Sequence, residues 1–351
     1  SISWKNAQDN IIKNRIFSIR DKITTQVAHD IKSPLAALEI VMDDIKELPE
    51  DSRELTLNAI NRIQEIANNL SKGGAEVEES KAHSSCLISY TLMATINEKK
   101  LELQSNSGLQ IKLHDLSDHQ NFIGINSTEI SRAISNLINN SAQALNYKGV
   151  IEVTLKKLDD KVRITVTDDG AGFPDSMLGT EIVRGNTIGK DDGQGLGLFH
   201  ASETISKAGG EFEIFNDSGA TVEMSIPLAN NPSWFASNIN FSSHDRIVVI
   251  DDDRSIHDLW KRVFKSKKIT KSVIHLQTNR EIEKGMSSVC DNDLVLIDHD
   301  LRYSKNGIEL IQEKKFKHVV LVTSGYEQED VQKFCVENEI QLLPKYLVGY
   351  L

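Results

Sequence analysis

The sequence has few cysteines, no excess of positive charge and no long apolar run. Its 351 residues carry a formal net charge of −11, which argues against a nucleic-acid binder because no basic surface is available to neutralise phosphates. Three widely spaced cysteines form no CxxC pair, a usage typical of free thiols in a reducing compartment. No apolar stretch approaches the roughly 20 residues that a membrane-spanning helix needs.

No secretory signal is visible. The chain begins at Ser1, without an initiating methionine, and its first residues already have a helical pattern. We therefore expect a cytoplasmic piece of a longer protein. The chain contains no internal repeat. Its 39% hydrophobic residues suffice for the packed cores of two or three domains.

Residues 1–81 have the apolar spacing of two amphipathic helices, with a break at Leu48-Pro-Glu-Asp-Ser. The first stripe is Ile12, Ile16, Ile19, Ile23 and Val27, and the second is Leu55, Ala59, Ile63, Ile66 and Leu70. Such a helical hairpin leaves apolar surface exposed, so we expect it to pair with a second copy as a four-helix bundle.

The rest of the chain alternates strands and helices. Residues 84–229 predict mixed α/β structure, with strands at 150–158, 162–168, 211–215 and 221–228. Residues 230–245 lose periodicity and gather Asn, Ser and Pro, which is typical of a linker. Residues 246–351 contain short, wholly apolar runs at 247–250, 294–297 and 319–322, which predict parallel strands in a doubly wound α/β domain.

One histidine stands out in the first helix. His29 lies on the side away from the apolar stripe, next to Asp30, and Pro34 follows at a cost of about 3 kcal/mol to the helix. An exposed neutral imidazole is a good nucleophile, and the adjacent carboxylate can orient it or take its proton. The alternative is an inert surface histidine.

Two sets of residues in the second region could form a nucleotide site. Asn136 and Asn140 are i,i+4 neighbours on one helix face, where a single ligand could meet both amides. Glycines in two turns would let backbone N–H groups approach phosphate oxygens. The candidates at these turns are Asp168, Gly170 and Gly172 after one strand, and Gly193, Gly195 and Gly197 before a helix at 199–207. Solvated asparagines and ordinary glycine turns are the alternative.

Acidic residues follow two of the apolar strands in the last region. Asp251, Asp252 and Asp253 come after the first of these strands, and Asp298 ends the second. Carboxylates converging at the carboxyl edge of a parallel sheet suit Mg²⁺. Thr323 and Lys345 add a hydroxyl and an ammonium, which favours a phosphoryl site over a plain metal site. The alternative is that each aspartate simply caps a helix or ends a strand.

All three regions resemble parts of hybrid sensor histidine kinases. His29-Asp-Ile-Lys-Ser-Pro resembles the phosphoacceptor box of these kinases. The asparagine and glycine segments, in this order, resemble the N, G1 and G2 boxes of the ATP-binding fold shared with gyrase, Hsp90 and MutL. Residues 246–351 resemble a response-regulator receiver domain, with Gly307 where that family has a turn glycine.

The resemblance implies a role for each site residue of the first two regions. His29 would take the phosphoryl group with help from Asp30. Asn140 would ligate Mg²⁺ with Asn136 nearby, and Asp168 would accept a hydrogen bond from the adenine amino group. Gly170 and Gly172 would shape the pocket, residues 173–192 would form a lid, and the glycines at 193, 195 and 197 would close on the phosphates.

In the last region, the resemblance makes Asp251 and Asp252 the acidic pair that holds Mg²⁺ together with Asp298, the phosphorylated aspartate. Thr323 would be the switch hydroxyl, and Lys345 would match the family's pocket lysine.

The joint prediction is a multidomain hybrid histidine kinase that uses ATP and Mg²⁺. It would comprise a dimerising hairpin, a two-layer α/β sandwich and a doubly wound domain. Phosphate would pass from ATP to His29 and then to Asp298. The expected partners are a second copy of the chain, an upstream sensor region and a downstream regulator or phosphotransfer protein. Three alternatives stay open: a non-catalytic signalling scaffold, a conformational ATPase, and a phosphatase of a separate regulator, which Ser33 makes less favoured.

Overall fold

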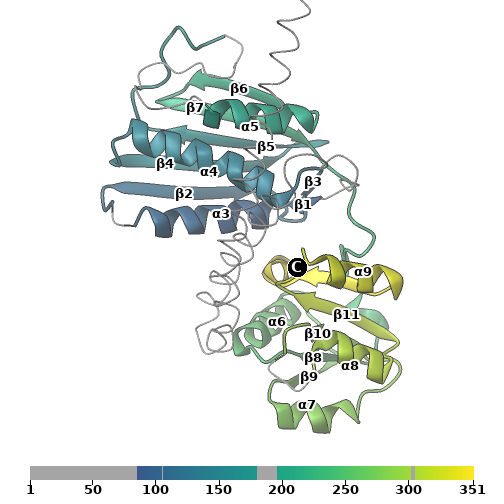
Figure 1. The fold of residues 1–351 in the computed structure, drawn as a ribbon. Coiled ribbons are helices and arrows are strands. Elements are labelled where there is room, and N and C mark those ends of the chain that lie inside the picture. The colour runs from purple at the N-terminus through teal and green to yellow at the C-terminus, as the bar shows by residue number, and fades with distance from the viewer. Residues whose placement is uncertain (1–84, 105, 180–195, 302–304) are drawn as a thin grey trace, which may run out of the picture. The chain divides into compact units, whose positions relative to one another are not determined.

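The computed structural model describes residues 85–104, 106–179, 196–301 and 305–351 (Figure 1). The predicted helical hairpin, with His29 and Asp30, lies outside the described residues, as do Gly193 and Gly195. We call residues 85–229 the central domain, 230–245 the connecting segment and 246–351 the C-terminal domain. Among the described residues, no helix is both long and apolar enough to cross a lipid bilayer.

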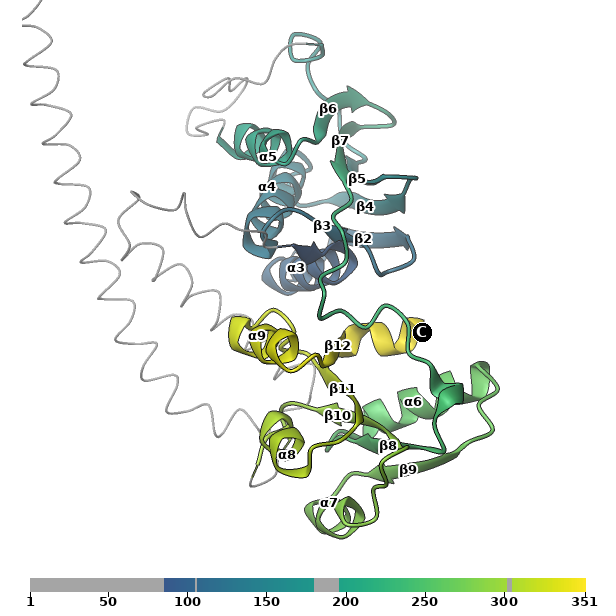
Figure 2. The same cartoon turned by 90° about the vertical axis from the view of Figure 1, so that its right-hand side faces the viewer.

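The central domain is a layer of helices on a mixed sheet. Its elements are β1 (Cys86–Leu87), α3 (Ile88–Glu102), β2 (Leu109–Leu116), β3 (Phe122–Ile123), α4 (Ser127–Ala144), β4 (Gly149–Lys157), β5 (Lys161–Asp168), α5 (Leu196–Lys207), β6 (Glu211–Asn216) and β7 (Ala220–Pro227). The five-stranded sheet has the order β2-β4-β5-β7-β6, and only the β2–β4 pair is parallel. Figure 2 shows α3, α4 and α5 together on one face of this sheet.

The sequence pattern explains this two-layer arrangement. In β5, Val162, Ile164 and Val166 alternate with less buried residues and point into the core. The apolar stripe of α4 packs against them, and Asn126 starts that helix by accepting a hydrogen bond from the backbone N–H of Thr128 at 2.8 Å. The four strands predicted in this region form within one residue of their predicted ends.

The connecting segment packs against the C-terminal domain, although its regular structure is limited to one short 3-10 helix, η1 (Phe241–Ser243). Phe235 forms a parallel bridge with Leu342. The N–H of Ala236 donates to the carbonyl of Leu342 at 2.9 Å, and the N–H of Leu342 donates to the carbonyl of Trp234 at 2.7 Å. The predicted linker therefore lies along the edge of the C-terminal sheet, with Trp234, Phe235 and Ala236 buried.

The C-terminal domain is a parallel sheet with helices on both faces. Its elements are β8 (Arg246–Ile250), α6 (Arg254–Ser266), β9 (Ser272–Leu276), α7 (Asn279–Met286), β10 (Leu294–Asp298), α8 (Gly307–Lys314), β11 (His318–Thr323), α9 (Glu329–Glu337), β12 (Gln341–Pro344) and the 3-10 helix η2 (Lys345–Tyr350). The strand order is β12-β11-β10-β8-β9, and every pair is parallel. Figure 2 shows α6 on one face and α8 and α9 on the other.

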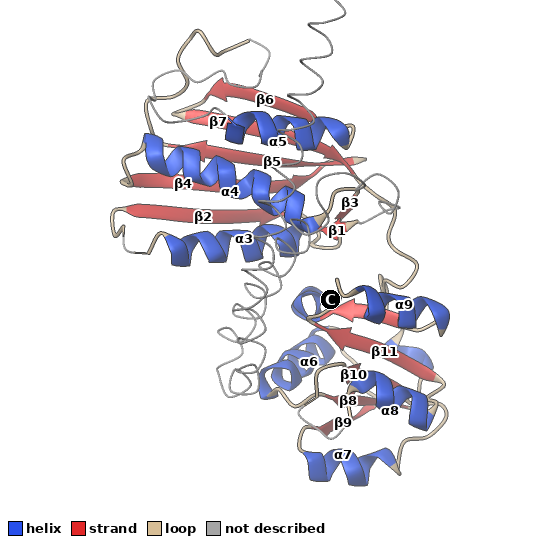
Figure 3. Ribbon diagram, in the orientation of Figure 1, coloured by secondary structure: helices blue, strands red, loops and turns tan. Residues whose placement is uncertain are grey.

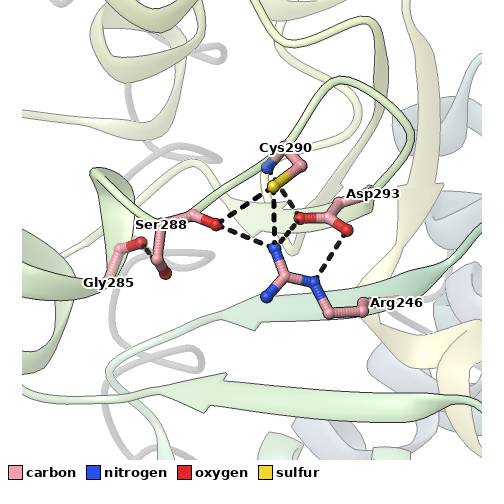
Figure 4. A network of polar contacts seen from close by, with 5 residues as sticks. All are labelled: Arg246, Gly285, Ser288, Cys290 and Asp293. Atoms are coloured by element: carbon pink, nitrogen blue, oxygen red, sulfur yellow. Dashed lines mark hydrogen bonds and ion pairs between the residues drawn. The ribbon is translucent and has the colours of Figure 1, made fainter.

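Figure 3 shows the blue helices that flank the strands of the C-terminal sheet. Coverage on both faces is the reason why these strands are continuous apolar runs, in contrast to the alternating β5. The start of β8 is held by a fork of charge-assisted hydrogen bonds (Figure 4). The guanidinium of Arg246 donates to both carboxylate oxygens of Asp293, at 3.0 and 2.6 Å, and to the carbonyl of Ser288 at 2.8 Å. Hydrogen bonding to Arg246 lowers the pKa of Asp293 from its ordinary value.

Candidate nucleotide and phosphoryl sites

The two predicted asparagines lie on α4 facing the start of α5. Asn136 is half-buried and Asn140 is exposed. A Cβ built on Gly197 would meet Nδ2 of Asn140 at 3.3 Å and Cβ of Asn136 at 3.5 Å. The fold thus brings both amides and the described glycine of the third segment to one place. Asn139, between them, points elsewhere and accepts a hydrogen bond from Lys99 of α3 at 3.1 Å.

The buried carboxylate of Asp168 ends β5 and organises the turn that follows. Its Oδ1 accepts hydrogen bonds from the backbone N–H of Gly170 at 3.0 Å and of Ala220 at 3.3 Å. Gly219 lies against it with φ +154°, and a Cβ there would come within 1.8 Å of the Asp168 carbonyl oxygen. Leu145, at the end of α4, packs close to Gly170, so the turn adjoins the asparagine helix.

A residue that the sequence did not single out holds the second glycine of this turn. Gly172 has φ +81°, and Asn216 clamps the next residue: its Oδ1 accepts from the N–H of Phe173 at 2.7 Å and its Nδ2 donates to the Phe173 carbonyl at 2.9 Å. Asn216 ends β6, forty-three residues away. No local signal could have identified it, because the strand order alone brings it to this turn.

The acidic residues predicted for the C-terminal domain do converge. Asp251, Asp252 and Asp298 each contribute one carboxylate oxygen, and these three oxygens all lie within 4.8 Å of one another. Nζ of Lys345 lies 3.0 Å from Oδ2 of Asp298 and 3.1 Å from Oδ2 of Asp251. Asp253, in contrast, caps α6 by accepting from the N–H of Ser255 at 2.7 Å.

These charges are almost completely buried. Asp251, Asp298 and Lys345 have exposed fractions of 1%, 2% and 7%. Burial, reinforced by the charge of Asp298, raises the pKa of Asp251 to about 8. Burial likewise raises the pKa of Asp298. Although burial alone would lower the pKa of Lys345, the two carboxylates raise it above its ordinary value. The pocket therefore holds one ammonium against carboxylates that are hard to ionise together.

The pocket fits a hard cation and a phosphoryl group. Oδ1 of Asp298 is buried and has no hydrogen-bond partner among the described residues, although buried acceptors are normally satisfied. Oxygen ligands from three carboxylates suit Mg²⁺. Thr323 ends β11 beside β10 and is fully buried. Gly307 packs so closely on the Asp298 backbone that a Cβ would approach its carbonyl oxygen to 2.0 Å.

A histidine that the sequence did not single out supports this pocket from α6. His257 is buried, and its Nε2 lies 2.7 Å from the backbone carbonyl of Asp251. Because a carbonyl can only accept, Nε2 carries the hydrogen. Its Nδ1 lies 2.8 Å from Nδ1 of His275 on β9. Both rings thus fix the backbone from which the carboxylate of Asp251 projects.

Comparison with known proteins agrees with the geometry of the central domain. Residues 125–230 match the family model described as histidine kinase-, DNA gyrase B- and HSP90-like ATPase. This range contains Asn136, Asn140, Asp168 and all of the glycines predicted for the nucleotide site.

Curated relatives include sensor histidine kinases and sporulation kinases. The NtrY-like sensor histidine kinase of Rickettsia felis is 26% identical over 235 residues, which cover 63% of this chain and 38% of that protein. Sporulation kinase A of Bacillus subtilis is 23% identical over 237 residues, 64% of this chain and 37% of that protein. The chain thus spans less than half the length of these relatives.

Among solved structures, full-length ShkA in complex with AMPPNP matches with 16% identity and a TM-score of 0.40, covering 94% of this chain and 71% of that one. The family match and the sequence relatives together place an α/β ATP-binding domain of the histidine kinase-, DNA gyrase B- and HSP90-like ATPase family in this chain, and they relate the chain to sensor histidine kinases.

Proposed function

We propose that this chain is an ATP-dependent protein-histidine kinase that phosphorylates itself on His29 and passes the phosphoryl group to Asp298. A nitrogen of the His29 imidazole attacks the γ-phosphorus, the bond to the β–γ bridging oxygen breaks, and ADP leaves. A carboxylate oxygen of Asp298 then attacks the same phosphorus, and the imidazole leaves. Asp30 orients His29 or takes its proton in the first step.

The observation that carries this proposal is the buried pocket of the C-terminal domain. Lys345 lies within 3.1 Å of two carboxylates, while Oδ1 of Asp298 has no hydrogen-bond partner among the described residues. A helix cap or a strand end needs neither a buried lysine nor an unsatisfied carboxylate. A phosphoryl acceptor needs both, because the incoming group brings negative charge and requires an available oxygen nucleophile.

The central domain supports the first half of the reaction. Asp168 would accept a hydrogen bond from the adenine amino group. Asn136 and Asn140, with the glycines at 193, 195 and 197, would surround the phosphates. Mg²⁺ bound by Asn140 in this domain, and by Asp251, Asp252 and Asp298 in the other, would neutralise phosphate charge. Pairing of residues 1–81 into a dimer and a downstream regulator or phosphotransfer partner belong to the same proposal.

The test is incubation of the chain with γ-labelled Mg·ATP, followed by acid and base treatment of the labelled protein. We expect acid-labile, base-stable label to accumulate in Asp298→Ala and to vanish in His29→Ala. His114→Ala and Asp291→Ala are matched controls, since both residues are exposed and lie outside the proposed sites, and they should label like the unaltered chain.

Three results would contradict all or part of the proposal. Label that persists in His29→Ala would contradict the assignment of His29 as the residue that takes the phosphoryl group from ATP. Bound ATP with no label in any variant would leave a signalling scaffold instead of a kinase. Normal labelling of His29 without any acyl phosphate on Asp298 would contradict only the transfer from His29 to Asp298.

A further inference from the structure

The C-terminal domain presents two tyrosines to a third tyrosine in α3 of the central domain. The ring of Tyr90 packs edge-on against Tyr326 at 5.4 Å between centroids and against Tyr346 at 5.6 Å. Tyr326 is 1% exposed, so its ring is fully enclosed. Burial raises the pKa of Tyr326 far above its ordinary value, which keeps the phenol protonated and able to donate.

An apolar core continues through this contact. Leu87 and Phe122 of the central domain are 0% and 1% exposed and belong to the same buried cluster as the strands of the C-terminal sheet. Phe122 packs edge-on against Trp234 and Phe235 of the connecting segment, at 5.9 and 4.9 Å between centroids. The N–H of Ala229 donates to the Phe122 carbonyl at 2.7 Å. Such continuous packing is typical of a specific interface rather than a loose tether.

Polar contacts extend the interface to the helix that carries the two asparagines. The Tyr326 hydroxyl donates to Oε1 of Glu327 at 3.1 Å, and the hydroxyl of Ser127 donates to Oε2 of the same residue at 3.2 Å. Ser127 is the first residue of α4. The Tyr346 hydroxyl lies 3.2 Å from Nδ1 of His119, whose ring stacks on Tyr350 at 3.7 Å.

Both tyrosines that contact Tyr90 lie close in sequence to residues of the acidic pocket. Tyr346 follows Lys345, the lysine that pairs with Asp298 and Asp251. Tyr326 lies three residues after Thr323, whose Oγ1 accepts a hydrogen bond from the N–H of Gly325 at 3.0 Å. A phosphoryl group on Asp298 would offer new acceptor oxygens to the Lys345 ammonium and the Thr323 hydroxyl. Satisfying them would shift the backbone on which Tyr346 and Tyr326 are mounted.

We propose that this interface is an intramolecular docking surface through which the state of Asp298 controls the central domain, with Tyr90 as the contact that both paths share. The packed arrangement fits the pocket without a phosphoryl group, and occupancy of Asp298 loosens it. The proposal rests on the assignment of Asp298 as a phosphoryl site. It goes beyond that assignment by naming the surface that responds.

Thermodynamic linkage requires that docking also affects the acidic pocket. If occupancy of the pocket weakens docking, then docking must weaken occupancy by the same factor, since coupling between two equilibria is reciprocal. Removing the Tyr90 ring should therefore make the pocket bind a phosphoryl analogue more tightly, although Tyr90 does not touch the pocket. A residue with a merely structural role would not have this effect.

The first experiment measures amide hydrogen exchange of the full chain with Mg²⁺ alone and with Mg²⁺ and beryllofluoride, a phosphoryl analogue that bonds to carboxylates. We expect beryllofluoride to speed exchange at the amides of Ala229, Ala236 and Leu342, whose hydrogen bonds to Phe122, Leu342 and Trp234 hold the connecting segment between the two domains. The amide of Val153, in the centre of the other sheet, is the internal reference. Asp298→Asn should abolish the response.

The second experiment compares beryllofluoride affinity in Tyr90→Ala, Tyr90→Phe and Tyr147→Ala. Tyr147 is the matched control because it is an exposed tyrosine of the central domain. We expect an increase of about 5- to 10-fold for Tyr90→Ala, a smaller one for Tyr90→Phe, and none for Tyr147→Ala. Retained ATP binding and an unchanged far-ultraviolet circular dichroism spectrum establish that both domains of each variant stay folded.

The outcomes separate this proposal from the kinase assignment, because neither experiment uses ATP turnover or His29. Beryllofluoride binding with unchanged exchange at the interface would overturn the docking proposal and leave Asp298 as a phosphoryl site. Unchanged or weaker affinity in a folded Tyr90→Ala chain would overturn it as well. Failure of beryllofluoride to bind the unaltered chain would overturn both.

Discussion

The two candidate sites of this chain differ in the groups that form them and in how deeply the charges are buried. In the central domain, the described groups are a turn shaped by glycines, a buried carboxylate satisfied by backbone N–H groups, and an exposed Asn140. In the C-terminal domain, three ionisable side chains are almost completely buried around one unsatisfied oxygen. The first site is a shaped surface that a ligand completes. The second holds its charges in place before any ligand arrives, at an electrostatic cost.

Removing the lysine from the charged pocket should produce the largest effect. Lys345→Met leaves Asp251 and Asp298 buried without their cation, so we expect the free energy of unfolding in EDTA to fall by about 3–5 kcal/mol. Urea unfolding followed by tryptophan emission measures it, since Trp234 and Trp260 are both buried. The exposed Lys333→Met should change it by less than about 0.5 kcal/mol. Equal effects of the two variants would contradict the contrast between the sites.

Protons should compete with Mg²⁺ for the acidic pocket of the C-terminal domain. The pKa of Asp251 is raised from 3.8 to about 8, so the folded chain keeps a proton that the unfolded chain loses. Without metal, this group's contribution to stability is therefore present at low pH and is lost as pH rises through 8. Mg²⁺ must displace the proton, so its affinity should rise by up to about 100-fold between pH 6 and 8.

Calorimetric titration of the chain with Mg²⁺ at several pH values measures this dependence. Asp251→Asn should weaken Mg²⁺ binding and flatten its response to pH. A Mg²⁺ affinity that stays constant across this range in the unaltered chain would show that the pocket does not hold the buried proton.

At the nucleotide turn, the charge of Asp168 matters for the hydrogen bond that this residue would accept from the adenine amino group. Asp168→Asn replaces a charged acceptor by a neutral one, and we expect ATP affinity to fall about 10- to 30-fold, the loss typical of a hydrogen bond to a charged group. Calorimetric titration with ATP provides the measurement. The control is Asp159→Asn, an exposed aspartate in the turn between β4 and β5. An ATP affinity that changes less than twofold in Asp168→Asn would remove the adenine contact from the proposal.

The smallest effect should come from the shape of the turn. Gly172→Ala forces a left-handed residue and places a Cβ 2.7 Å from Oδ1 of Asn216, so we expect a loss of about 1–2 kcal/mol. Gly179→Ala has a similar φ, +70°, with no heavy atom within 4 Å of the new Cβ, and it isolates the backbone strain. Thermal unfolding of both variants, with and without Asn216→Ala, separates strain from collision. If the two glycine variants are equally destabilised, Asn216 exerts no steric constraint.

Local patterns predicted the secondary structure because burial acts on each strand separately. Alternation in β5 and continuous apolar residues in β10 reflect one covered face and two covered faces, and both can be read along the chain. The convergence of Asp251 and Asp298 was predictable for a related reason: the carboxyl ends of neighbouring parallel strands share an edge.

Contacts between distant elements could not be predicted in this way. Asn216 reaches the glycine turn only through the pairing of β6 and β7, and His257 reaches Asp251 only through the packing of α6 on the sheet. Tyr90, Tyr326 and Tyr346 carry no motif at all. The connecting segment appeared to be a plain linker because Asn, Ser and Pro dominate its composition, whereas its few apolar residues determine where it packs.

The sequence by itself therefore determined the elements, the residue types at both sites and the chemistry these can perform, because helix and strand periods and strand ends are local properties. Only the tertiary structure decided that Lys345 bridges two carboxylates and that one oxygen of Asp298 has no hydrogen-bond partner among the described residues. It also decided that Tyr326 and Tyr346 of the C-terminal domain pack against Tyr90 of α3. These features depend on distances between residues far apart in the chain, and such distances arise only when the cores close.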